Sequence, residues 1–149
     1  TAMLTRKGSR QHRRAGHVWL VGLGGLCATA PVLASLDWGH RWHLVVLGAV
    51  AAILAALGFL GARRRWVGWR VAHIAGMGCS FITVLTAFYV DNGPHLPLWD
   101  RLPTIAFWLL PSAIGAPLIA RAVLRESLPR LGIAAVLLAV VGIAVISLG

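Results

Sequence analysis

The basic residues of this chain are sorted into alternate gaps between long apolar segments. Of the fourteen Lys and Arg residues, twelve lie before the first segment, between the second and third, or between the fourth and fifth. The other two gaps hold only Arg41 and Arg101, together with Asp37, Asp91 and Asp100. A polytopic membrane protein sorts its charges in this way because basic loops stay on the cytoplasmic side. The pattern therefore restricts the chain to folds that cross a bilayer several times.

Five segments have the length and composition of membrane-spanning helices. A helix needs about 20 apolar residues to cross a hydrocarbon core of about 30 Å. The predicted spans are 17–36, 43–62, 71–90, 102–120 and 131–149. Because the loops are short, sequential helices should be neighbours. The sequence predicts an all-α, integral membrane up-down bundle of about five transmembrane helices, with the N-terminus inside and the C-terminus outside.

The chain divides into a basic segment and a membrane domain. Residues 1–16 are predicted to be a basic cytoplasmic segment, and 17–149 a single transmembrane domain. The chain begins Thr-Ala-Met. This start leaves open whether the basic segment is the tail of a preceding helix.

Composition excludes a soluble nucleic-acid-binding protein. Only 12% of the residues are charged and 58% are hydrophobic, whereas globular domains carry about 25% charged residues. The net charge is +10, but the arginines border apolar spans and the tail lacks the interleaved aromatics of a single-strand-binding surface. The predicted partners are anionic headgroups of the bilayer, and a membrane-protein partner or a second copy of the chain remains open.

The third predicted span carries a polar face. His73, Gly76, Ser80 and Thr83 repeat every three or four residues, so they share one side of a helix. Asp91 lies five turns after His73, about 27 Å along the axis. His73, Ser80, Thr83 and Asp91 are therefore candidates for a proton or ion path. The alternative is a packing face whose hydroxyls donate to carbonyls of their own helix.

Histidines on different spans suggest a redox cofactor. Two axial histidines from neighbouring helices hold a membrane b-type haem. His17 and His73 have similar predicted depth, and His43 lies at the opposite membrane edge. We therefore take His73, His43 and His17 as candidate ligands of a b-type haem. The histidine spacing within the predicted helices does not indicate a zinc or di-iron site, and Cys27 and Cys79 do not form a metal-binding pair. No other metal is therefore predicted.

The fourth predicted span contains two prolines, Pro111 and Pro117, near its middle. Each removes a backbone donor and frees a carbonyl one turn back. The pattern predicts an irregular helix, which either borders a cavity, as discontinuous membrane helices do, or bends to improve packing.

Two stretches resemble a known group of proteins. Residues 7–16 read KGSRQHRRAG, and the run 73–92 begins with HIAGMG and ends with AFYVDN. They are similar to an uncharacterised family of small bacterial multi-pass membrane proteins with a KGxxxHRRxG signature. The resemblance implies the bacterial inner membrane and a further helix before the motif, and it supplies no activity. The position of His17 resembles Arg in that family, which weakens the His17–His73 pair, whereas His43 matches a family-like His.

The sequence alone leaves the biochemical activity unknown. Three hypotheses remain: a redox module that binds haem or quinone, a proton, ion or small-solute pathway, and an accessory subunit of a membrane complex. None of the patterns indicates an enzyme.

Overall fold

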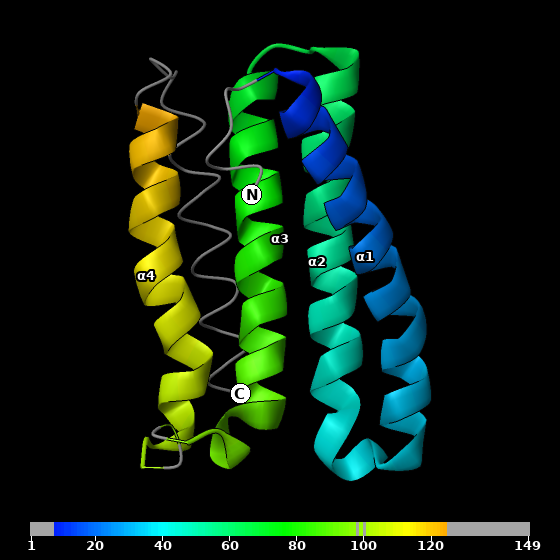
Figure 1. Cartoon of the computed structure of the whole chain (residues 1–149), viewed down its shortest axis with the longest axis vertical. Helices are drawn as coiled ribbons and strands as arrows, with labels where there is room; N and C mark the ends of the chain where they lie inside the picture. Colours follow the sequence, from blue (N-terminus) through cyan, green and yellow to red (C-terminus); the bar gives the residue numbers. More distant parts are fainter. Residues whose placement is uncertain (1–7, 98, 100, 125–149) are drawn as a thin grey trace.

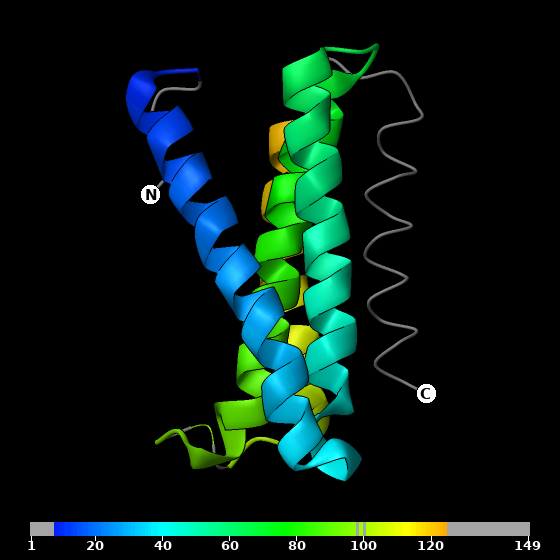
Figure 2. The same ribbon diagram turned by 90° about the vertical axis from the view of Figure 1, so that its right-hand side faces the viewer.

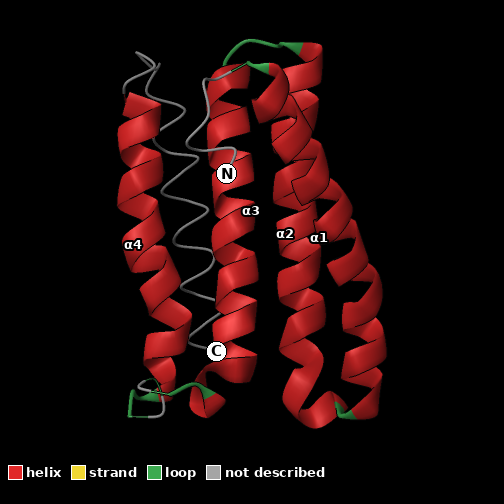
Figure 3. Ribbon diagram, viewed as in Figure 1, coloured by secondary structure: helices red, strands yellow, loops and turns green. Residues whose placement is uncertain are grey.

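The computed structural model describes residues 8–97, 99 and 101–124 of the 149-residue chain. The described part is all-helical and contains no strand (Figure 3), which confirms the predicted all-α class. The fifth predicted span, 131–149, lies outside the described residues. The helices are α1 (Arg10–Leu36), α2 (Trp38–Arg64), α3 (Trp69–Asn92), the 3-10 turn η1 (Gly93–His95) and α4 (Thr104–Leu124).

The four long helices run up and down, and each packs against the next one along the chain (Figure 1). All four are long and apolar enough to cross a membrane. The start of α1, the α2–α3 connection and the end of α4 lie at one end of the bundle. The described arginines other than Arg41 and Arg101 belong to these segments, so we call this end the basic end. The α1–α2 and α3–α4 connections form the opposite end.

Helix α1 begins earlier than the sequence predicted, at Arg10 and not at residue 17. The Ser9 hydroxyl caps it by accepting a hydrogen bond from the backbone N–H of His12 at 3.1 Å. Residues 10–16 are mostly good helix formers, so the helix continues back to this cap. Its 27 residues extend about 40 Å, which exceeds the hydrocarbon core by about 10 Å.

Helices α2 and α3 approach backbone to backbone through two glycines. A Cβ added to Gly76 would lie 2.6 Å from the carbonyl oxygen of Leu54 and 2.8 Å from the amide nitrogen of Gly58. No side chain fits in that space, so glycine is required at position 76. Small residues allow this close packing between membrane helices, where dispersion forces replace hydrophobic burial as the source of stability.

Helices α3 and α4 pack by inserting isoleucines over glycines. Ile119 of α4 lies over Gly78, and Ile82 of α3 lies over Gly115. A Cβ at either glycine would come within 2.8 Å of the facing isoleucine side chain. These contacts belong to the larger buried core cluster, which comprises Val71, Cys79, Ile82, Ile119 and Val123.

The fourth helix, α4, is continuous from Thr104 to Leu124, through both Pro111 and Pro117. It is therefore not a discontinuous helix, and a bend that improves packing stays a prediction. Membrane helices tolerate proline when neighbours and local adjustments satisfy the freed carbonyls. Pro111 is buried in the bundle, whereas Pro117 is exposed. Helix α4 is therefore long and apolar enough to cross a membrane despite its two prolines.

Helix α1 is the least embedded of the four. Its only buried residues are Leu23 and Ala34, and it leans away from α2 and α3 toward its N-terminal end (Figure 2). Three ring pairs join this N-terminal half to the other helices: His12 with His73, His17 with Phe59, and Trp19 with Phe81. The first half of α1 is thus held mainly through side chains.

Candidate functional site at the basic end

His73 lies in the second turn of α3 and reaches across to α2. Its Nδ1 is 3.1 Å from the carbonyl oxygen of Gly58. A carbonyl only accepts hydrogen bonds, so Nδ1 is the donor and carries the hydrogen. In the neutral ring the lone pair is then on Nε2, the nitrogen that remains for a ligand. Metal-binding histidines are commonly fixed in this way by a backbone carbonyl.

The ring beside His73 is that of His12. The two ring centroids are 6.0 Å apart with an interplanar angle of 70°. His12 is half-buried and lies in the first turn of α1, close to the Ser9 cap. The cap fixes the start of α1, and with it the position from which His12 reaches α3.

His17, the predicted partner of His73, faces a different neighbour. Its ring is 6.3 Å from that of Phe59 on α2. Its Nδ1 lies 2.7 Å from the carbonyl oxygen of Arg13, one turn earlier in the same helix. The His17 side chain is exposed, and its ring packs on Phe59 and not on His73.

The imidazole pair lies at the basic end, in helices whose ends carry most of the described arginines. Arg65 and Arg70 lie 5.8 Å and 5.6 Å from the ring centre of Trp69, a cation–π arrangement that keeps the guanidinium groups near the indole. Arg10, Arg13 and Arg14 occupy the first turns of α1, next to His12 in the sequence. The end of the bundle that carries the pair is therefore suited to a ligand with acidic groups.

The polar face of α3 is mostly satisfied by its own helix. Thr83 donates to the carbonyl of Cys79 at 2.9 Å, and Thr86 donates to that of Ile82 at 3.0 Å. Both threonines are fully buried. Ser80 is also fully buried, and its hydroxyl has no hydrogen-bond partner among the described residues. Thr83 thus behaves as a packing residue would, whereas Ser80 is a candidate path residue whose buried hydroxyl is not satisfied by its own helix.

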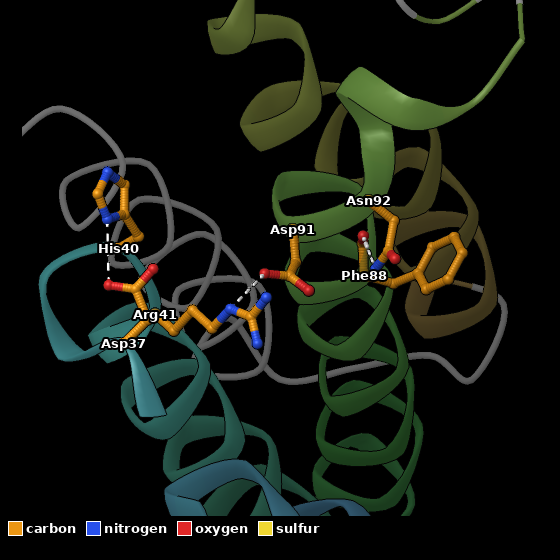
Figure 4. Close-up of polar contacts among 6 residues, drawn as sticks. All are labelled: Asp37, His40, Arg41, Phe88, Asp91 and Asn92. Carbon is orange, nitrogen blue, oxygen red and sulfur yellow. Dashed lines mark hydrogen bonds and ion pairs between the residues drawn. The ribbon is translucent and has the colours of Figure 1, made fainter. Parts of the chain in front are cut away.

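Asp91 lies at the opposite end, where it faces α2. Its Oδ1 is 4.0 Å from Nε of Arg41, at the limit of an ion pair (Figure 4). The same close-up shows Asp37 with His40, whose Nδ1 is 3.2 Å from the Asp37 carboxylate. The His40–Asp37 pair is largely exposed and the Arg41–Asp91 pair partly exposed, so each contributes about 0–1 kcal/mol. Asp91 therefore links α3 to α2 at the end of the bundle opposite to His73, five helical turns away.

His43 occupies a separate aromatic setting. Its ring lies 6.4 Å from Trp42 and 6.0 Å from Trp108 of α4, in edge-on geometry. The residue is only 9% exposed, and its Nε2 has no hydrogen-bond partner within the described chain. Among the described residues the ring of His43 therefore packs against tryptophans and is not paired with a second histidine.

The structure thus brings together one pair of histidines, and sequence reasoning named one of its two members. His12 was treated as part of a basic tail because the predicted helix began at residue 17. The signal that would have found it is Ser9, a good N-cap residue placed just before a run of helix formers. Once the helix begins at Arg10, His12 becomes a helical residue facing the bundle.

No cluster of three or more His, Cys, Asp or Glu residues suited to a metal ion occurs in the described ranges. Comparison with known proteins gives no assignment: no family model matches the chain, and neither the curated proteins nor the solved structures include a significant match.

Proposed function

We propose that this chain is a redox module of the bacterial inner membrane that holds a b-type haem between His12 of α1 and His73 of α3. The observation that carries the proposal is the pairing of these two rings, one of them fixed by the Gly58 carbonyl. When bound, haem iron supplies one-electron transfer.

The two histidines are of the residue type that holds a membrane b-type haem. Their rings, whose centroids are 6.0 Å apart, would supply the pair of histidine ligands. His73 donates its Nδ1 hydrogen to Gly58, which orients the ring and leaves Nε2 for coordination. The arginines of the basic end would neutralise the carboxylates of the cofactor.

Membrane orientation forms part of the proposal. The described arginines of the basic end lie on α1, the α2–α3 connection and α4. Basic loops are retained in the cytoplasm, so we place the basic end, and with it His12 and His73, on the cytoplasmic side. A fifth span over 131–149 would then put the C-terminus outside.

An absorption spectrum tests the haem proposal. The full-length protein, purified from haem-replete cells, should show a Soret band that is lost in His73→Ala and in His12→Ala. The matched control is His17→Ala. This variant removes an imidazole at a similar depth in the membrane, whose ring packs on Phe59, and it should keep the Soret band. A colourless wild-type protein would overturn the proposal, since a simple edge-on ring contact also gives centroid separations of about 6 Å. Equal loss in His17→Ala would overturn the assignment of His12.

The pathway hypothesis is the second candidate, and Ser80 favours it. A buried hydroxyl without a partner is costly unless water or an ion satisfies it. The pathway hypothesis predicts proton or ion flux in proteoliposomes, and this flux should fall in both Ser80→Ala and Asp91→Asn while the fold is retained.

The hypothesis of an accessory subunit predicts neither colour nor flux. It predicts instead a stable complex that co-purifies with the chain.

A further inference from the structure

A groove runs along the contact between α1 and α2. Its volume is about 290 Å³, and its lining is apolar. Leu20, Gly24 and Cys27 line it from α1, and Ala52, Ala56 and Phe59 from α2. Gly24 and Ala56 are exposed on the surface of the bundle. The groove therefore opens toward the medium around the helices, which for a spanning helix is lipid.

Basic residues continue both walls of this groove toward the basic end. On α1, Arg13 and His17 precede Leu20 at helical spacing, so they belong to the same face. On α2, Arg63 follows Phe59 by one turn and is likewise exposed. The groove thus has an apolar floor and a cationic mouth. A ligand that matches it has a long apolar chain and an anionic head.

The groove and the basic residues beyond it together match one leaflet of a bilayer. On α1 the groove is lined from Leu20 to Cys27. Arg13 lies beyond this lining, fourteen positions before Cys27, which is about 21 Å along the helix axis. Half of a bilayer, including the headgroup region, measures about 20–22 Å. A chain whose head lies at Arg13 would therefore end near Cys27, at the bilayer midplane.

We propose that this groove binds one acyl chain of an anionic phospholipid, with the phosphate held by Arg13 and Arg63. The occupant is a bound lipid in a fixed place, distinct from the general attraction of the arginines for the membrane surface. It would fill the space between the loosely packed α1 and the rest of the bundle. The site goes beyond the proposed redox function and does not depend on haem.

Glycine positions in α1 provide a matched test of the groove. A Cβ added at Gly24 or at Gly25 would have no heavy atom within 4 Å, so both positions have room for a side chain. Only Gly24 lines the groove. The full-length protein is extracted with mixed phosphatidylglycerol and phosphatidylcholine, and the retained lipids are counted by native mass spectrometry. We expect preferential retention of phosphatidylglycerol in the wild type, its loss in Gly24→Leu, and its retention in Gly25→Leu.

The cationic mouth is tested separately, with the groove left intact. Each basic residue near an anionic surface contributes roughly a fivefold change in binding, so Arg13→Gln with Arg63→Gln should weaken phosphatidylglycerol retention about thirtyfold. Equal retention of the two lipids by the wild type would overturn the anionic assignment. Unchanged retention in Gly24→Leu would overturn the groove as the site. Both outcomes are independent of the Soret band that tests the haem proposal.

Discussion

Gly76 is a position at which the packing of α2 against α3 leaves no room for a side chain. Its missing side chain lets the backbones of α2 and α3 touch at Leu54 and Gly58. Gly22, in contrast, lies on α1 with open space around the position of a Cβ. Two glycines in helices of the same bundle thus differ in whether they can be replaced by a larger residue. The difference depends on which atoms face each glycine.

Gly76→Ala should destabilise the bundle. The new methyl group meets backbone atoms that no rotamer change can move, so α2 and α3 must separate, at a cost of roughly 1–3 kcal/mol. Thermal unfolding in detergent should show a lower midpoint. Gly22→Ala is the control and should leave the midpoint unchanged or raise it, since alanine favours helix by about 1 kcal/mol. Equal midpoints for the two variants would contradict the backbone contact.

Thr83→Val distinguishes packing from transport. The Thr83 hydroxyl donates to the carbonyl of Cys79 in its own helix, so its removal leaves no buried donor unpaired and nearly preserves the volume. We expect a change in unfolding free energy below about 1 kcal/mol and unchanged proton or ion flux in proteoliposomes. A large fall in flux with an intact fold would show that Thr83 serves a path and that its helix bond is incidental.

At the scale of elements, periodicity and length predicted the helices well, but local chemistry set their ends. Helix α3 extends two residues beyond its predicted span at each end, whereas α2 begins five residues earlier and ends two residues later than predicted. The start of α1 was missed by seven residues, since the Ser9 cap extends a helix beyond its apolar part. Which histidines meet was not predictable, because it depends on how far α1 tilts from its neighbours.

Pro117→Ala tests how α4 accommodates its prolines. The helix is continuous through Pro117, whose side chain is exposed. Alanine restores a backbone donor one turn after Ala113 and removes the ring that crowds this turn, where proline normally costs about 3 kcal/mol. We expect a higher unfolding midpoint and retained lipid and cofactor binding. A lower midpoint would indicate that a bend at Pro117 is needed for α4 to pack on α3.

For the whole molecule, charge sorting sets both the topology and the expected orientation. The up-down path brings the basic segments of α1, α2, α3 and α4 to one end. That much was predictable, because alternate gaps of an up-down bundle must share an end. The tight α2–α3–α4 packing and the looser α1 were not, since they depend on glycines and isoleucines that meet only in three dimensions.

Labelling with a membrane-impermeant thiol reagent checks the orientation. Val67, in the α2–α3 connection, is 99% exposed, and His40 lies exposed at the start of α2, at the opposite end of the bundle. With the native cysteines replaced by alanine, a cysteine at position 40 should react in intact spheroplasts. A cysteine at position 67 should react only after the membrane is opened. The reverse pattern would invert the orientation.

The backbone contact between Gly58 and Gly76 also bears on how the protein is made. The two glycines are eighteen residues apart and are joined by a short connection, so their helices can meet as soon as both have been synthesised. Contacts between segments close in sequence form early, and membrane helices associate after each has inserted. The α2–α3 hairpin is thus the natural nucleus of assembly in the membrane. Helix α1, although synthesised before α2 and α3, would complete its contacts with them only after this hairpin has formed.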